Sequence, residues 1–122
     1  MRMANVIFQR EPIISLQEFI GILDQSGLGK RRPIDNPQLL KRMLEGSNLI
    51  VTARLDGELI GFLRGLTDFC FRCFIADLAV VKSWQRKNIG KHMLQFTRDL
   101  VPEARLILFS AEDAEGFYQK AG

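Results

Sequence analysis

The stretch that decides the fold runs from Ile75 to Leu94 and reads IADLAVVKSWQRKNIGKHML. Its first part, residues 75–81, is rich in apolar and β-branched side chains, which is typical of a strand buried in a core. Its second part has the three-to-four-residue spacing of an amphipathic helix, carried by Ile89, Met93, Phe96 and Leu100. A polar, basic hinge, QRKNIGK (residues 85–91), joins the two parts.

This hinge has the properties of an anion-binding turn. A strand that passes into a helix through a short hinge leaves several backbone N–H groups without partners at one point. The helix dipole adds about half a positive charge there, and phosphate is the typical ligand. Arg86, Lys87 and Lys91 add positive charge to the same turn. The sequence therefore predicts a phosphate site at the start of the helix, and the alternative is a solvated basic helix terminus.

Three segments in this order resemble the GCN5-related N-acetyltransferase (GNAT) family. Residues 85–90, QRKNIG, resemble the Q/R-x-x-G-x-G/A signature that holds the pyrophosphate of acetyl-coenzyme A in that family. Residues 77–80, DLAV, resemble its central strand, and Ala114 with FYQKAG (residues 117–122) resembles its A-x-x-F-Y-x-K-x-G segment. Asn88 stands where the first motif glycine is usual, and asparagine tolerates the left-handed backbone better than most residues.

The resemblance implies an acetyl-CoA-dependent N-acetyltransferase that needs no metal. Acetyl transfer would go directly to a primary amine of a small molecule or peptide within a ternary complex. In the family, the central strand separates from its neighbour at a bulge, and its N–H groups, here those of Leu78 and Val80, polarise the thioester carbonyl. The cofactor-binding residues implied are Leu78, Ala79, Val80, Gln85, Arg86, Lys87, Asn88, Ile89, Gly90 and Lys91.

Two residues are candidates for proton transfer. Tyr118 occupies the position of the family tyrosine that protonates the departing thiolate, and a phenol has a suitable pKa for that task. Its alternative role is packing on the core. Asp77 is the candidate base, acting through water, and its alternative is an aspartate at a sheet edge or facing solvent. Ala111 replaces an asparagine that many members use against the cofactor arm, so a non-catalytic acyl-CoA-binding or regulatory module is the second hypothesis.

The rest of the chain supplies the other elements of an α/β fold. Ser15 with Glu18 forms a capping box, Asn36 precedes Pro37 as a helix start, and the pair Asp56-Gly57 predicts a hairpin. The expected order is strand (5–9), helix, helix, strands (49–55, 58–66 and 71–81), helix (from about 88, ended before Pro102), strand (106–110) and helix (from 113). This order predicts a mixed, mostly antiparallel sheet flanked by helices, as in the family.

Length and composition restrict the class of protein. The 122 residues suit a single domain, residues 1–122, and no apolar run approaches a membrane span. Because a signal-peptide pattern is also lacking, a cytoplasmic location is expected. The net charge of +3 is too mild to demand nucleic-acid binding, and a small basic nucleic-acid-binding domain is the third hypothesis. In the family another strand follows a glycine like Gly122, so truncation is expected, with strand donation in a homodimer as the alternative.

Two further features have ordinary explanations. Cys70 and Cys73 form a C-x-x-C, but they and the single histidine, His92, cannot complete a four-ligand zinc site. Reduced structural cysteines are therefore expected, and His92 is expected to face solvent. The basic triplet at residues 30–32 lies on the acceptor side in the family, where it would favour an acidic acceptor, although such charge runs are commonly solvated.

Overall fold

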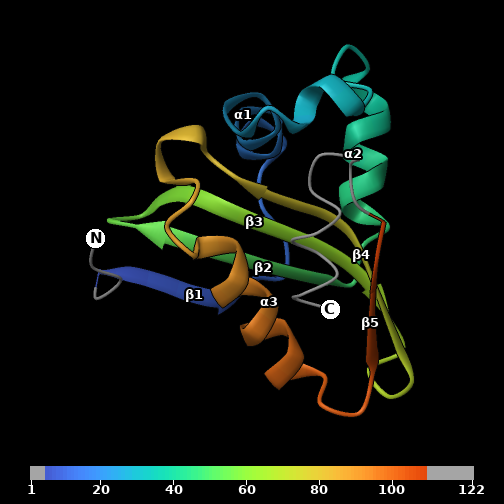
Figure 1. Cartoon of the computed structure of the whole chain (residues 1–122). Coiled ribbons are helices and arrows are strands. Elements are labelled where there is room, and N and C mark those ends of the chain that lie inside the picture. The colour runs from blue at the N-terminus through green and yellow to red at the C-terminus, as the bar shows by residue number, and fades with distance from the viewer. Residues whose placement is uncertain (1–4, 110–122) are drawn as a thin grey trace.

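A computed structural model describes residues 5–109 of the chain. One five-stranded sheet has the order β1-β2-β3-β4-β5, in which β1 to β4 are successively antiparallel and β5 is parallel to β4 (Figure 1). The strands are β1 (Val6–Arg10), β2 (Leu49–Leu55), β3 (Glu58–Thr67), β4 (Arg72–Val80) and β5 (Arg105–Leu108). The helices are α1 (Leu16–Ser26), α2 (Pro37–Glu45) and α3 (Ile89–Leu100), with short 3-10 turns η1 (Leu28–Arg31) and η2 (Lys82–Trp84).

The sequence prediction of a mixed, mostly antiparallel sheet flanked by helices is confirmed. Local signals set the element starts. The Ser15 hydroxyl accepts a hydrogen bond from the Glu18 N–H at 3.0 Å, and the Asn36 side chain accepts one from the Leu39 N–H at 3.2 Å. The turn between β2 and β3 contains Gly57 with φ 84°, as the hairpin signal requires. The helix predicted from residue 113 lies outside the described residues.

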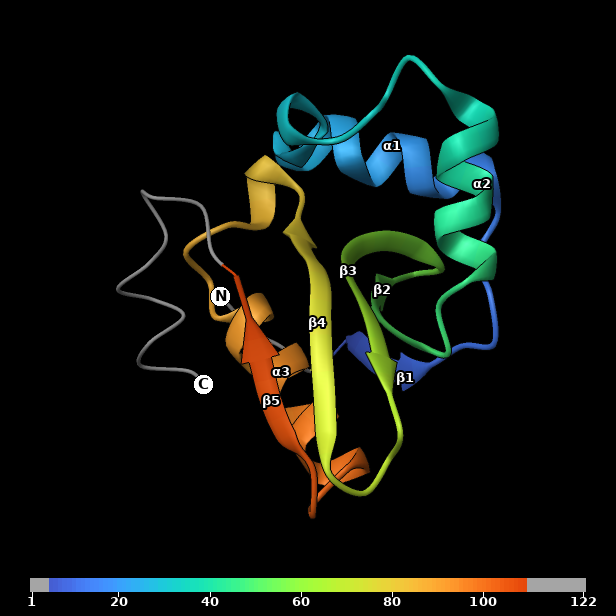
Figure 2. The same cartoon turned by 90° about the vertical axis from the view of Figure 1, so that its right-hand side faces the viewer.

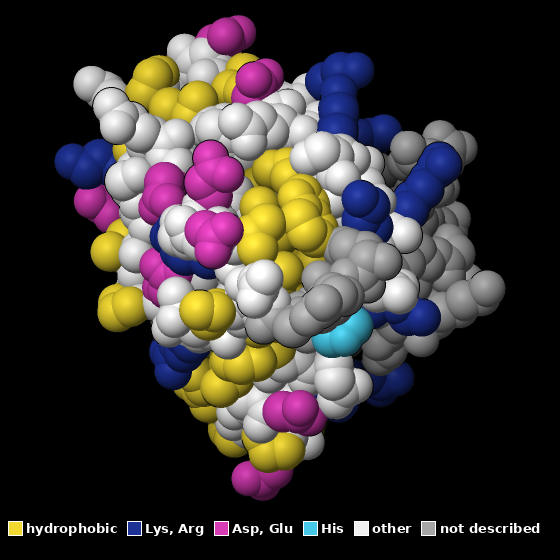
Figure 3. Space-filling view, turned by 90° about the vertical axis from the view of Figure 1, so that its left-hand side faces the viewer, with side chains coloured by type: hydrophobic (Ala, Val, Ile, Leu, Met, Phe, Trp, Pro, Cys, Tyr) yellow, Lys and Arg dark blue, Asp and Glu magenta, His cyan; other side chains and the backbone are white. Residues whose placement is uncertain are grey.

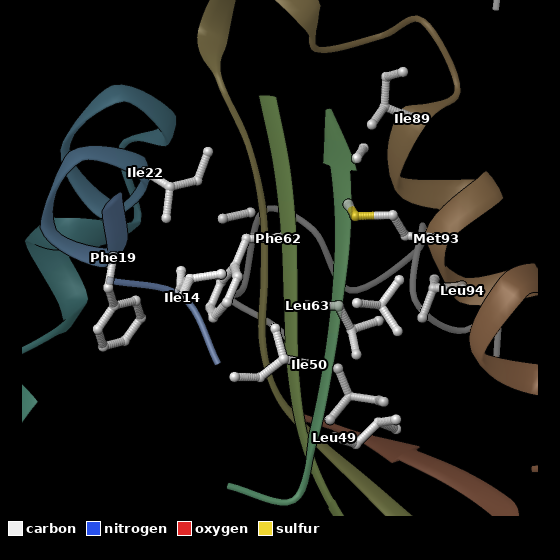
Figure 4. Close-up of a cluster of buried hydrophobic side chains, with 14 of the residues drawn as sticks. Ile14, Phe19, Ile22, Leu49, Ile50, Phe62, Leu63, Ile89, Met93 and Leu94 are labelled. Carbon is white, nitrogen blue, oxygen red and sulfur yellow. The ribbon is translucent and has the colours of Figure 1, made fainter. Parts of the chain in front are cut away.

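The sheet has helices on both faces. Figure 1 shows α1 and α2 on one face and α3 on the other, and Figure 4 shows the buried side chains that fill each side. The α1 side is filled by Ile14, Phe19, Ile22, Ile50 and Phe62, and the α3 side by Leu49, Leu63, Ile89, Met93 and Leu94. Gly61 brings α3 close to β3, because a Cβ there would lie 2.9 Å from Met93 Cε. The absence of a side chain at this position lets α3 pack close to the sheet. Leu100, which was predicted for the apolar stripe of this helix, is instead exposed.

A bulge in β4 changes which face its side chains occupy. Arg64 pairs with Asp77, whereas the next residue of β3, Gly65, pairs with Ile75, so Ala76 is an extra residue. Successive residues of β3 point to opposite faces, and therefore Ile75 and Asp77 also lie on opposite faces. The bulge implied by the family resemblance is confirmed.

The bulge coincides with the place where β4 and β5 part. The two strands pair only between residues 72–75 and 105–108. Figure 2 shows the gap between them widening toward the C-terminal end of β4. Within the described part of the chain, residues 77–80 therefore have a strand partner on the β3 side alone.

An ion-pair cluster joins the first turn of α1 to the sheet. The Arg54 guanidinium lies 2.7 Å from Glu11 Oε2 and 2.7 Å from Glu18 Oε2, and the Thr52 hydroxyl also donates to Glu11. Hydrogen bonds from Arg54 hold the pKa of both carboxyls below their ordinary value. The pKa of each carboxyl is lower in the folded protein than in the unfolded chain. The ion pairs therefore stabilise the fold fully at a pH above the pKa of the unfolded chain, and this stabilisation is lost as the pH falls through the pKa of the folded protein.

We therefore expect Arg54→Met to flatten the acid dependence of stability. Urea unfolding of the parent should show the free energy of unfolding falling between about pH 6 and about pH 3, and the variant should show a shallower fall. Arg42→Met, at an exposed arginine of α2, serves as the control and should keep the parental slope. Equal slopes for Arg54→Met and the parent would contradict the role of this cluster.

Candidate functional site

The hinge between β4 and α3 is a turn with two left-handed residues. Asn88, the N-cap of α3, has φ 68° and ψ 14°, and Arg86 has φ 63°. The expectation that asparagine would accept the left-handed geometry is thus confirmed. Within the described residues, the backbone N–H groups of residues 86–91 donate no hydrogen bond, and the first helical bond runs from the His92 N–H to the Asn88 carbonyl at 3.0 Å. Together with the exposed side chains of Lys87 and Lys91, this turn suits an anion.

The outer edge of β4 presents N–H groups to the space beside β5. The Val81 N–H donates to the Ile60 carbonyl of β3 at 2.9 Å. Because N–H groups alternate between the two edges of a strand, those of Ala79 and Asp77 also face β3, and those of Leu78 and Val80 face the other way. Strand β5 does not pair beyond Ile75. An extended ligand could therefore hydrogen-bond to this edge as a strand would.

Gln85 joins the hinge to two other parts of the backbone. Its side-chain nitrogen donates to the Val80 carbonyl at 2.8 Å and to the Ser26 carbonyl, at the end of α1, at 3.1 Å. Its backbone N–H donates to the backbone carbonyl of Lys82. The direct cofactor contact predicted for Gln85 stays a prediction, since both nitrogens of this residue already have acceptors.

Asp77 lies buried between two arginines on the α1 side of the sheet. Its Oδ1 accepts from Arg32 Nε at 2.7 Å and its Oδ2 accepts from Arg64 Nε at 2.5 Å, and its side chain is 0% exposed. The alternative of a solvent-facing aspartate is therefore wrong. The role of base stays a prediction, and taking up a proton on either oxygen would disrupt a charge-assisted hydrogen bond.

The comparisons with known proteins decide the family. The sequence profile of the Acetyltransferase (GNAT) family matches residues 17–122. The chain belongs to the GNAT acetyltransferases. No curated protein matches the sequence significantly.

Solved structures share the fold of this GNAT acetyltransferase. A GNAT-family acetyltransferase from Streptococcus pneumoniae TIGR4 has a TM-score of 0.77 and 23% identity, over 94% of this chain and 84% of that chain. An aminoglycoside acetyltransferase from an uncultured soil metagenomic sample has a TM-score of 0.70 and 21% identity in complex with trehalose, over 98% and 90% of the two chains. Its complex with sisomicin gives 0.69 and 19%, over 96% and 85%. At these identities the likeness shows a shared fold.

Several residues singled out in the sequence lie away from this site or beyond the described part. Tyr118, Ala111 and the 117–122 segment fall outside the described residues. His92 is exposed and stacks on Phe8 with ring centroids 5.6 Å apart, which agrees with a solvent-facing position. Cys70 is exposed and Cys73 is buried, and both are free thiols. Burial raises the pKa of Cys73, the opposite of what an activated thiolate needs.

Two arginines, Arg32 and Arg64, occupy positions in this site that the sequence pattern did not predict. Arg32 turns inward to Asp77 instead of joining Lys30 and Arg31 at the surface. Arg64 was not singled out, although an arginine inside the apolar run of β3 signals a buried charge that needs a carboxylate partner. Among residues 5–109 no group of metal-ligating side chains could hold an ion, and no helix is long and apolar enough to cross a bilayer.

A groove of about 690 Å³ lies on a neighbouring face, between α1, the β2–β3 turn and η2. Figure 3 shows this face, where apolar side chains are exposed in a hollow between acidic and basic ones. Its lining includes the apolar residues Ile22, Ile60 and Trp84 and the acidic residues Glu18 and Glu58. None of the residues predicted to bind the cofactor lines it. The groove is therefore separate from the predicted cofactor site on β4 and the turn at residues 86–91.

Gln85 gives a direct test of how the hinge is held. We expect Gln85→Met, which keeps the length of the side chain but removes both donors, to lower the free energy of unfolding by about 1 kcal/mol. Urea unfolding measures the change, and Gln38→Met, at an exposed glutamine of α2, should have no effect. A Gln85→Met protein as stable as the parent would show that these two hydrogen bonds contribute nothing.

Proposed function

We propose that this GNAT acetyltransferase transfers an acetyl group from acetyl-CoA directly to a primary amine of a small molecule or peptide, in a ternary complex. One observation carries the proposal. The edge of β4 that presents the Leu78 and Val80 N–H groups is followed, after the short 3-10 turn η2, by the turn at residues 86–91, whose N–H groups are also free to bind a ligand within the described residues. An extended ligand with a phosphate group partway along its length suits a strand edge and a turn that both present N–H groups.

In this proposal the turn holds the cofactor's pyrophosphate and the edge of β4 holds its pantetheine arm. The turn contributes the N–H groups of residues 86–91 and the charges of Arg86, Lys87 and Lys91. The strand contributes the N–H groups of Leu78 and Val80, one of which would donate to the thioester carbonyl as negative charge develops on its oxygen. Ala79 is buried and directs its N–H to β3, so its part is to keep the strand paired.

The reaction also requires two proton transfers. The amine must lose a proton before it attacks the carbonyl carbon, and the departing thiolate must gain one. We assign the second transfer to Tyr118 on the strength of its family position. For the first transfer, the contacts of Asp77 with Arg32 and Arg64 support a structural role better than that of a base.

The identity of the acceptor amine is a question for an activity assay, because the fold and the turn at residues 86–91 concern the cofactor. The aminoglycoside acetyltransferase with a similar fold supports including aminoglycosides, which are small molecules with primary amines, among the compounds tested. The assay is release of free coenzyme A thiol over a panel of such amines, other small amines and peptide amines. Binding of acetyl-CoA without turnover of any amine would indicate the non-catalytic acyl-CoA module.

Acetyl-CoA should stabilise the folded protein. At about one hundred times its dissociation constant, the ligand should add about 2.7 kcal/mol to the free energy of unfolding and raise the melting temperature. Gly90→Val should abolish this shift, because a branched side chain prevents the close approach of the backbone to a phosphate. Gln95→Val, on the exposed side of α3, should keep it. A melting temperature unmoved by saturating acetyl-CoA would refute the cofactor assignment.

Tyr118→Phe tests the proposed acid. The variant keeps the ring and loses the transferable proton, so turnover should fall by about 10² to 10⁴ while acetyl-CoA affinity is unchanged. Steady-state kinetics with a reactive amine, combined with calorimetric binding, measures both quantities. Parental turnover under conditions where chemistry limits the rate would assign Tyr118 to packing.

A further inference from the structure

The guanidinium of Arg32 contacts two adjacent residues of β4, Ala76 and Asp77. Its Nε donates to Asp77 Oδ1 at 2.7 Å, and its Nη2 donates to the carbonyl of Ala76 at 3.0 Å. Ala76 is the extra residue of the bulge, and its pairing partner in β3 is missing. Arg32 therefore supplies a hydrogen bond to the carbonyl at the position where the regular ladder is interrupted.

Asp77 is in turn fixed from the opposite side. Arg64, its cross-strand neighbour, donates from Nε to Oδ2 at 2.5 Å and from Nη1 to the Ser47 hydroxyl at 3.2 Å. The Asp77 side chain is fully buried, whereas that of Arg32 is 23% exposed. Asp77 is thus an anchor held by the sheet, and Arg32 reaches it from the connection between α1 and α2.

The bulge sets the direction of the N–H groups that follow it. Leu78 is two residues beyond Ala76, and Val80 is four residues beyond. Their N–H groups face the open edge because the strand resumes regular pairing with β3 at Asp77. A change in the backbone at Ala76 would rotate or shift these donors, and donors for a developing oxyanion must be held in place before the reaction.

We infer that Arg32, anchored by Asp77, is a positioning residue for acetyl transfer: it holds the bulge at Ala76 and so aims the Leu78 and Val80 N–H groups at the acyl carbonyl. This inference rests on the proposed function. It assigns Asp77 to the support of the backbone donors and not to deprotonation of the amine. It also explains why an arginine is used, since a planar guanidinium binds a carboxylate and a carbonyl at the same time and a lysine ammonium does not match that geometry.

The first test compares Arg32→Met with Arg32→Lys. We expect Arg32→Met to lower kcat by about 10- to 100-fold, less than the loss of an oxyanion donor itself, with a smaller loss of acetyl-CoA affinity, because the turn at residues 86–91 still holds the pyrophosphate. Arg32→Lys should recover only a minor part of kcat. Arg42→Met, which removes an equal charge from the exposed face of α2, should match the parent. Parental kcat in Arg32→Met, or full rescue by lysine, would overturn the inference.

The second test separates an anchor from a base. If Asp77 acts through Arg32, Asp77→Asn and Arg32→Met should lower kcat with the shape of the pH–rate profile unchanged. The double variant should be little worse than the more impaired single one, because residues that act as a unit are not additive. Loss of the acidic limb in Asp77→Asn alone, with additive effects in the double variant, would make Asp77 the base and overturn the inference.

The third test does not depend on activity. Backbone amide NMR of Arg32→Met should show shifted resonances at Ala76, Leu78 and Val80 and faster hydrogen exchange at the Ala79 N–H, which pairs with β3; Arg42→Met should not. Unmoved amides would overturn the inference even if kcat fell. If the parent neither binds acetyl-CoA nor acetylates any amine, the proposed function fails by itself, and this experiment still shows whether Arg32 holds the bulge.

Discussion

A single extra residue in β4 is the constraint on which the site depends. Side chains alternate along a strand, so one inserted residue moves every later side chain to the other face. Ile75, before the extra residue, lies on the α3 side of the sheet. Asp77, after it, lies on the α1 side, where Arg64 is its cross-strand neighbour. A carboxylate buried in this way is tolerable only with charged partners, and Arg32 and Arg64 provide them.

The bulge also links packing to ligand binding. It lies where β5 stops pairing with β4, so among residues 5–109 no strand pairs with that edge of β4 beyond the bulge. The short 3-10 turn η2 then connects β4 to the turn at residues 86–91, and α3 is held close to the sheet at Gly61. The strand edge and the helix terminus both belong to the folded sheet and its packed helix. Neither has to become ordered when an extended ligand binds to both, which lowers the entropic cost of association.

Local chemistry made much of the fold predictable from the sequence. The capping residues Ser15 and Asn36, the Asp56-Gly57 turn and the change of hydrophobic period after residue 81 each act over a few residues. The order of strands and helices up to β5 followed from them. The left-handed turn at Asn88 followed as well, because only a few residue types accept that backbone.

What the sequence by itself determined, then, was the element order and the basic turn before α3, since both arise from neighbouring residues. Only the tertiary structure decided the faces of β4 beyond Ala76, because a bulge carries no residue type of its own. It also decided the partners of Asp77 and Gln85. The Arg32–Asp77 pair spans 45 positions and the Gln85–Ser26 contact spans 59, so both exist only once the strands and helices have packed and burial forces each polar group to find an acceptor or a donor.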